Sequence, residues 1–194
     1  MMSDATLEKW SRREALGAGV ALFAGMVVDV AWLSEARAQG ATLRQDPRHA
    51  FADRLSDLVI PATDTPGASA AGVGAFVLLA LDRGMGDLQP VMLERVRAAL
   101  DASAGGDFMK ASPDRQVAVL TAFDLAAYAG ARPAAETPAF AWRRIKSAIC
   151  GGYYTSEIGA SKELVYEPVP GGFRNIKLTP DFRLRSNDGL GGAI

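Results

Sequence analysis

Three dipeptides in this chain join a helix-capping residue to proline, and they constrain the fold more than any other feature. They are Asp46-Pro47, Ser112-Pro113 and Thr137-Pro138. Asp, Ser and Thr side chains accept hydrogen bonds from the first turn of a helix, and proline fits the first helical position because its missing N–H would lack a partner there. Each dipeptide therefore predicts the start of a helix.

Apolar residues recur at helical spacing after these starts and in two further segments. Glycines separate or end the segments at Gly84, Gly86, Gly105-Gly106 and Gly151-Gly152. The predicted helices cover about 46–60, 69–82, 88–101, 113–129 and 138–150. Their predicted inward residues are Phe51, Leu55, Leu58, Val59, Val73, Phe76, Val77, Leu81, Met92, Val96, Leu100, Val117, Leu120, Leu125, Phe140, Ile145 and Ile149. We expect an all-α fold, a compact bundle of about five helices.

The helical spacing is lost beyond Gly152, where glycine and proline recur every few residues. One short strand at 164–166 is the single regular element that we expect there. This irregular tail is rich in tyrosine and other apolar residues, so we expect it to be covered rather than left in water. It can wrap the chain's own helices or a partner subunit. Pro168-Val-Pro170 is pre-extended and tyrosine is frequent at interfaces, which favours a partner.

The N-terminus reads as a twin-arginine signal peptide. Arg12 and Arg13 precede residues 15–28, a run of 14 residues without a charged side chain. A membrane-spanning helix needs about 20 apolar residues, so the run is short for an anchor. Ala36 and Ala38 form a small-x-small cleavage site. The alternative is a buried first helix that happens to contain two arginines. We predict cleavage after Ala38, export by the twin-arginine translocase and a periplasmic location.

Removing this leader changes the charge only slightly. The full chain has 21 basic and 22 acidic residues, and the leader carries four and five of these, so the remainder holds 17 of each. The remainder therefore lacks the excess of basic residues that would indicate nucleic-acid binding. We divide the chain into the signal peptide (1–38), a helical domain (39–150) and an extended partner-binding tail (151–194).

The motifs of common active sites are missing from the sequence. His49 is the one histidine, so neither a usual catalytic triad nor a histidine-rich metal site can be assembled. Gly72-Val-Gly74 does not follow a predicted strand and so cannot cradle a dinucleotide phosphate. Asp53 and Asp57 stand at helical spacing, and we expect them to face solvent. We therefore predict no catalytic residue, metal site or cofactor in this chain.

Cys150 is the one cysteine, so it has no partner for a disulfide within the chain. An odd cysteine in an exported protein indicates either a bond to another chain or a free thiol. It can also serve as a small buried apolar residue. A protein exported in folded form carries either a cofactor or a partner, and since the sequence shows no cofactor motif, a partner remains.

Three parts of the chain resemble the gluconate 2-dehydrogenase subunit 3 family, the small subunits of periplasmic sugar dehydrogenases. The first is the leader. The second is Leu58-Val-Ile-Pro-Ala-Thr-Asp-Thr-Pro-Gly-Ala68 with Gly72, Val73 and Phe76, and the third is Gly151-Gly-Tyr-Tyr-Thr-Ser-Glu-Ile-Gly159 with Tyr166-Glu-Pro-Val-Pro-Gly171. The segment from about 88 to 137 resembles the family only in helical character.

The resemblance implies a non-catalytic subunit. Its large partner would be a flavin-dependent oxidoreductase of the glucose-methanol-choline type, which binds FAD, oxidises a sugar or polyol and lacks an export signal. A cytochrome c would accept the electrons and can hold the complex at the membrane. The small subunit would act as export escort, folding partner and stabiliser.

The resemblance also suggests which residues meet the partner. Cys150 stands directly before the Gly-Gly-Tyr-Tyr stretch, so it becomes a candidate for an intersubunit disulfide. The remaining interface candidates are Tyr153, Tyr154, Tyr166, Pro168, Pro170 and Phe173. Two other functions stay open: a stand-alone periplasmic all-α binding module that uses the loop 61–68 or the tail, and a free-standing enzyme with an unrecognised site.

Overall fold

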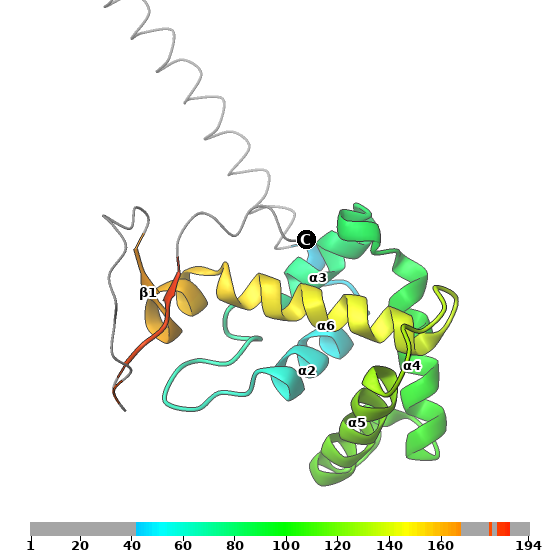
Figure 1. Ribbon diagram of the computed structural model, residues 1–194. Helices are drawn as coiled ribbons and strands as arrows, with labels where there is room; N and C mark the ends of the chain where they lie inside the picture. Colours follow the sequence, from blue (N-terminus) through cyan, green and yellow to red (C-terminus); the bar gives the residue numbers. More distant parts are fainter. Residues whose placement is uncertain (1–41, 168–178, 180–181, 187–194) are drawn as a thin grey trace, which may run out of the picture. The chain divides into compact units, whose positions relative to one another are not determined.

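The computed structural model describes residues 42–167, 179 and 182–186 (Figure 1). Its helices and strands belong to one unit, Leu43–Ile194. The five α-helices of this part are α2 (His49–Val59), α3 (Val73–Asp82), α4 (Pro90–Ala104), α5 (Pro113–Tyr128) and α6 (Pro138–Tyr154). The 3₁₀ helices η1 (Met85–Asp87) and η2 (Phe108–Lys110), the π-helix η3 (Gly159–Glu163) and the parallel strands β1 (Val165–Tyr166) and β2 (Arg185–Ser186) complete it. The all-α prediction is confirmed.

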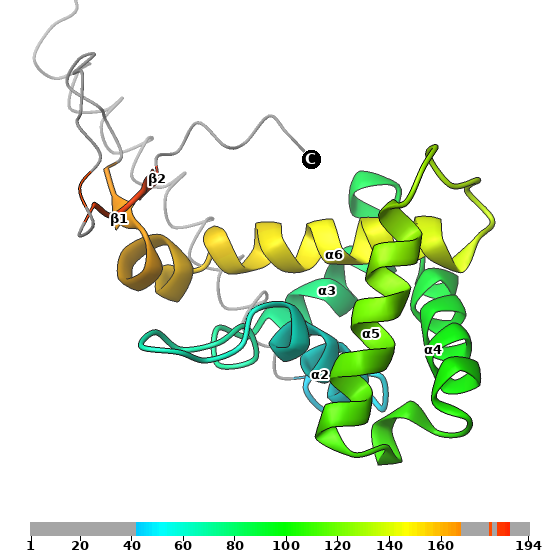
Figure 2. The same cartoon turned by 60° about the horizontal axis from the view of Figure 1, so that its bottom comes forward.

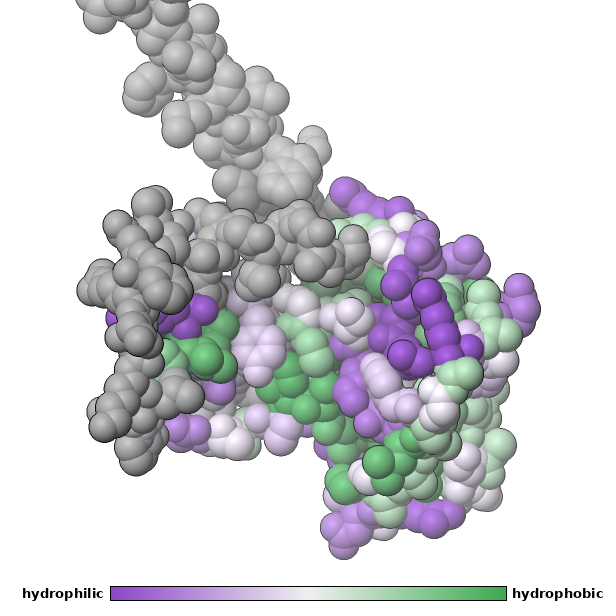
Figure 3. All heavy atoms as spheres, viewed as in Figure 1, coloured by the Kyte–Doolittle hydropathy of each residue, from purple (hydrophilic) through white to green (hydrophobic). Residues whose placement is uncertain are grey.

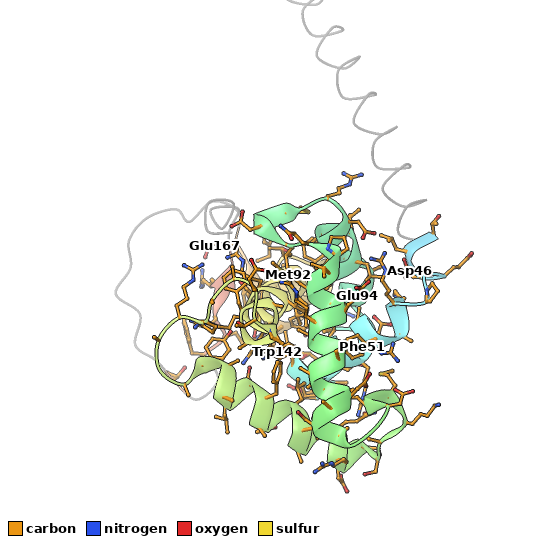
Figure 4. The ribbon with its side chains drawn as sticks, turned by 90° about the vertical axis from the view of Figure 1, so that its right-hand side faces the viewer. Asp46, Phe51, Met92, Glu94, Trp142 and Glu167 are labelled. Carbon is orange, nitrogen blue, oxygen red and sulfur yellow. The ribbon has the colours of Figure 1, made fainter. Side chains whose placement is uncertain are left out.

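Helix α6 organises the core, because it contacts each of the other four α-helices. Figures 1 and 2 show it crossing the bundle, with α4 and α5 packed along its first half. Trp142, Ile145, Ile149 and Tyr153 of α6 are all 1 % exposed or less. Figure 4 shows Phe51, Met92 and Trp142 between the helices that carry them. Within the described residues, no helix has the length and apolar character to cross a membrane.

Two of the three predicted helix caps are confirmed. Ser112 Oγ accepts a hydrogen bond from Arg115 N at 3.3 Å, and Thr137 Oγ1 accepts one from Phe140 N at 3.2 Å. Proline occupies the first turn after each cap, as the sequence indicates. These bonds fix the starts of α5 and α6.

The third cap, at Asp46, is wrong: α2 begins at His49 and Arg48 holds the cap position. Asp46 forms a turn instead, because its carboxylate accepts hydrogen bonds from both the backbone N–H and the guanidinium of Arg48. These bonds lower the pKa of Asp46 to about 2. The same guanidinium donates to Asp82 at 2.9 Å, so it joins the start of α2 to the end of α3.

Two further helices begin later than predicted. Helix α3 starts at Val73 rather than Ser69, because residues 69–72 form turns and Gly72 has a left-handed φ of 75°. Helix α4 starts at Pro90 rather than Leu88, since Leu88 and Gln89 are extended.

The predicted inward face of α5 is wrong. Leu120 is buried, but Val117 is 51 % exposed and Leu125 is 68 % exposed. The buried residues of α5 are Gln116, Val119, Leu120 and Ala127, a face rotated from the predicted one. Gln116 explains the error: this polar residue faces inward because its amide donates to Phe108 O at 2.9 Å and accepts from Arg54 Nε at 2.7 Å.

The predicted stop of the last helix at Gly151-Gly152 is also wrong. Helix α6 continues through both glycines to Tyr154 and so crosses the boundary predicted at residue 150. A Cβ atom on Gly152 would lie 2.5 Å from Cδ1 of Phe76. Glycine is therefore needed here for close packing of α3 against α6 rather than for a helix end. The strand expected at 164–166 is confirmed as β1, but it is not the single regular element there, because η3 precedes it and β2 pairs with it.

Candidate functional site

The structure describes four of the predicted site residues. The targeting residues Arg12, Arg13, Ala36 and Ala38, and the interface candidates Pro168, Pro170 and Phe173, lie outside the described residues. The predictions made for these seven positions stay predictions. Cys150, Tyr153, Tyr154 and Tyr166 are described, and all belong to α6 or to β1.

Cys150 lies half-buried on α6 as a free thiol. Burial raises the pKa of this thiol; the Lys146 ammonium lowers it, and the Asp124 carboxylate raises it further. A raised pKa favours the thiol over the thiolate that is needed for nucleophilic catalysis.

The tyrosines that follow Cys150 have different environments. Tyr153 is 1 % exposed, and its hydroxyl donates to Pro66 O at 2.8 Å, so this side chain packs within its own chain. Tyr154 is 38 % exposed and lies one turn beyond Cys150. Its ring is edge-on to that of Tyr153, and the two ring centroids are 5.3 Å apart. Tyr166 on β1 is 49 % exposed. Cys150 and Tyr154 are thus neighbours on the surface of α6, and the buried ring of Tyr153 packs against that of Tyr154.

The loop 61–68 is attached to the end of α6 and to η3. Besides the bond from Tyr153 to Pro66, the Thr65 hydroxyl donates to Glu163 Oε2 at 2.5 Å. A cavity of about 480 Å³ opens beside this attachment. Its lining residues are Asp64, Thr65, Lys162, Glu163, Leu164, Phe182, Arg183 and Leu184. In the described part of the chain, no group of three or more His, Cys, Asp or Glu residues could hold a metal ion.

Asp53 packs against α3 and Asp57 against the turn that precedes it, so the prediction that they face solvent is wrong. Asp57 Oδ1 accepts from Ser69 N at 2.9 Å. Asp53 Oδ1 is buried against Gly74, while its Oδ2 lies 3.5 Å from His49 Nδ1. Burial raises the pKa of Asp53, an effect that His49 opposes and Asp57 reinforces.

The raised pKa of Asp53 predicts a pH-dependent effect of Asp53→Asn. A carboxyl whose pKa is higher in the folded state adds stability at low pH, and this contribution is lost as the pH rises through the folded pKa. The stability of Asp53→Asn relative to the natural chain should therefore increase from about pH 3 to about pH 7. Urea unfolding across this range measures the difference. Asp53→Leu should show the same trend, and a difference that does not change with pH would contradict the prediction.

The exposed side of α5 is a feature that the sequence prediction missed. Beside it lies an open, largely apolar groove of about 210 Å³ between α2, α5 and α6. Its lining residues are Leu58, Val59, Val117, Leu120, Thr121, Asp124, Leu125, Trp142 and Lys146. Asp124 accepts from Trp142 Nε1 and from Lys146 Nζ, both at 2.7 Å, which fixes the groove wall. Figure 3 shows hydrophobic surface over α2 and the neighbouring part of α5.

Comparison with protein families gives one match, to the family described as gluconate 2-dehydrogenase subunit 3, over residues 46–171. Comparisons with curated proteins and with solved structures gave no match. The matched range runs from the turn before α2 to beyond β1, so it includes all five described α-helices, the loop 61–68 and Cys150. It covers well over half of the 194 residues. The chain belongs to the gluconate 2-dehydrogenase subunit 3 family.

Proposed function

We propose that this chain is the non-catalytic small subunit of a periplasmic, flavin-dependent sugar dehydrogenase and that it escorts and stabilises the catalytic subunit. The family match over residues 46–171 carries this proposal. Membership in the family makes the chain a small subunit of a dehydrogenase complex, and such a complex implies a catalytic partner subunit. The escort role, the flavin and the periplasmic location are the parts that we add.

The escort role is supported by the leader. A twin-arginine signal directs export of a folded protein, and a partner without a signal can be carried with it. The sequence of this chain offers no cofactor motif that would otherwise require folding before export. We infer that the partner is the cofactor-bearing component, a glucose-methanol-choline-type flavoprotein that binds FAD, and that a cytochrome c accepts its electrons.

Coexpression tests this proposal. The chain is expressed with and without the neighbouring reading frame of its genome and is then purified from the periplasm. Recovery of a yellow, flavin-containing complex of much larger mass is the expected result. Recovery of this chain alone, soluble and colourless, would reject the subunit proposal and would turn attention to the cavity beside the loop 61–68 as a ligand site.

Cys150 gives a second, independent prediction for the same complex. Its half-buried position beside exposed Tyr154 lets it contact a partner cysteine. We expect a disulfide, in which two thiols lose two protons and two electrons to the thiol oxidants of the periplasm. The denatured complex should then migrate as one band on a non-reducing gel. Cys150→Ser should give two bands, as should the natural complex after reduction. Two bands from the natural complex without reductant would contradict this prediction.

A further inference from the structure

Helix α5 carries a row of large side chains that remain largely exposed in the described part of the chain. Val117, Leu125 and Tyr128 are 51 %, 68 % and 46 % exposed. Their spacing places them on one side of the helix, and Figure 2 shows α5 as the outermost helix on this side of the bundle. The apolar groove lies directly beside them. Contiguous exposed apolar residues of this kind mark interaction surfaces.

Basic residues extend this surface toward the C-terminal end of α5. The Arg143 guanidinium lies 4.7 Å from the ring centroid of Tyr128, and Lys146 Nζ lies 4.9 Å from the same ring. Arg132 lies 5.6 Å from the ring centroid of Phe140. An open cavity of about 370 Å³ lies here, lined by Tyr128, Arg132, Phe140, Arg143, Arg144 and Ser147.

The positive charge at this end is only partly neutralised. Lys146 pairs with Asp124 at 2.7 Å, and Arg144 pairs with Asp87 at 2.9 Å. Arg132 and Arg143 have no carboxylate partner among the described residues. The whole chain has a net charge of −1, so this local excess is not a general property of the protein. Carboxylates on a partner would complement this charge.

The apolar and basic ends form one continuous surface, because Lys146 lines the groove and also lies over Tyr128, which lines the basic cavity. We call it the α5–α6 seam. It consists of Val117, Leu125, Tyr128, Lys146, Arg132 and Arg143. We propose that the seam docks a segment of the catalytic subunit that places an apolar side chain in the groove and carboxylates beside Arg132 and Arg143. This inference rests on the proposed function, which supplies the partner.

Charge complementarity favours the catalytic subunit over a second copy of this chain. The seam of a second copy contains no carboxylate, and the one that lines its groove, Asp124, is already bound to Lys146 and Trp142. Pairing two seams would add cations to cations and leave Arg132 and Arg143 without partners. A segment of different sequence, with acidic and apolar residues, satisfies both ends at once.

Charge reversal tests the basic end in the full complex. Arg132→Glu and Arg143→Glu, singly and together, are coexpressed with the catalytic subunit, and the affinity between the purified subunits is measured at low and high salt. Loss of a charge-assisted contact should weaken binding about tenfold per arginine. The double variant should also lose most of the salt dependence of the association rate. Lys110→Glu, an equal charge change at an exposed residue of η2, is the matched control and should bind like the natural chain.

Photo-crosslinking tests the apolar end without disturbing the charges. A photo-crosslinking amino acid placed at Leu125 should yield a product with the summed mass of this chain and the catalytic subunit. The same probe at Lys110 should not. A product with a second copy of this chain, or unchanged affinity of the charge-reversed variants in a complex that forms normally, would overturn the seam while leaving the proposed function intact. Failure of the natural chain to form any complex would reject both.

Discussion

Trp142→Ala is expected to lower the free energy of unfolding by about 3–5 kcal/mol, since removal of a buried tryptophan leaves a large cavity. Trp142 is 1 % exposed and lies where α5 meets α6. Its ring centroid lies 6.3 Å from that of Phe123, and its Nε1 donates a hydrogen bond to Asp124 Oδ1 at 2.7 Å. The substitution removes the buried ring and the hydrogen bond from Trp142 to Asp124, which then keeps only its bond from Lys146. Urea unfolding followed by circular dichroism measures the loss.

Trp142→Phe separates packing from hydrogen bonding in this prediction. Phenylalanine keeps most of the buried ring but cannot donate to Asp124, so a loss of about 1–2 kcal/mol is expected. If Trp142→Ala and Trp142→Phe were equally stable, packing at this position would contribute little, and the described contact of α5 with α6 would be incorrect.

Gly74→Ala is expected to destabilise the chain by about 2–3 kcal/mol through crowding between α2 and α3. A Cβ atom on Gly74 would lie 2.1 Å from Oδ1 of Asp53 and 2.9 Å from its backbone nitrogen. The side chain can rotate away, but the backbone nitrogen moves only if α2 moves. Thermal unfolding of the purified chain provides the measurement.

Two variants show whether crowding is the cause. Gly130 has a φ of 75° and nothing within 4 Å of an added Cβ, so Gly130→Ala should show only the backbone cost of about 1 kcal/mol. Asp53→Ala combined with Gly74→Ala should be less destabilising than the sum of the single changes, because the nearest clashing atom is gone. Strict additivity would argue against contact between these two residues.

Local signals in the sequence predicted much of this fold. The caps at Ser112 and Thr137 and the apolar spacing of α6 depend on residues a few positions apart, and the structure confirms them. The errors arise where a distant residue decides. Gln116 faces inward because of Arg54 and the backbone of Phe108, and that contact shifts the buried face of α5.

The same distinction holds for the candidate site. Cys150 was open to three interpretations, and the structure places it half-buried beside exposed Tyr154. The burial of Tyr153 could not be predicted, because it depends on a hydrogen bond to Pro66, far away in the sequence. The α5–α6 seam was missed because Val117 and Leu125 were assigned to the core. Exposed apolar residues next to Arg132 and Arg143 become visible only once the buried face of α5 is known.

The attachment of the loop 61–68 also determines when the chain can finish folding during synthesis. Its hydrogen bonds from Tyr153 to Pro66 and from Thr65 to Glu163 join residues that are 87 and 98 positions apart. Chains emerge from the ribosome N-terminus first, and contacts between distant positions form slowly. The loop therefore leaves the ribosome long before its partners do. The body therefore reaches its final form only after residue 163 has been made and the loop, present since early in synthesis, has met its partners.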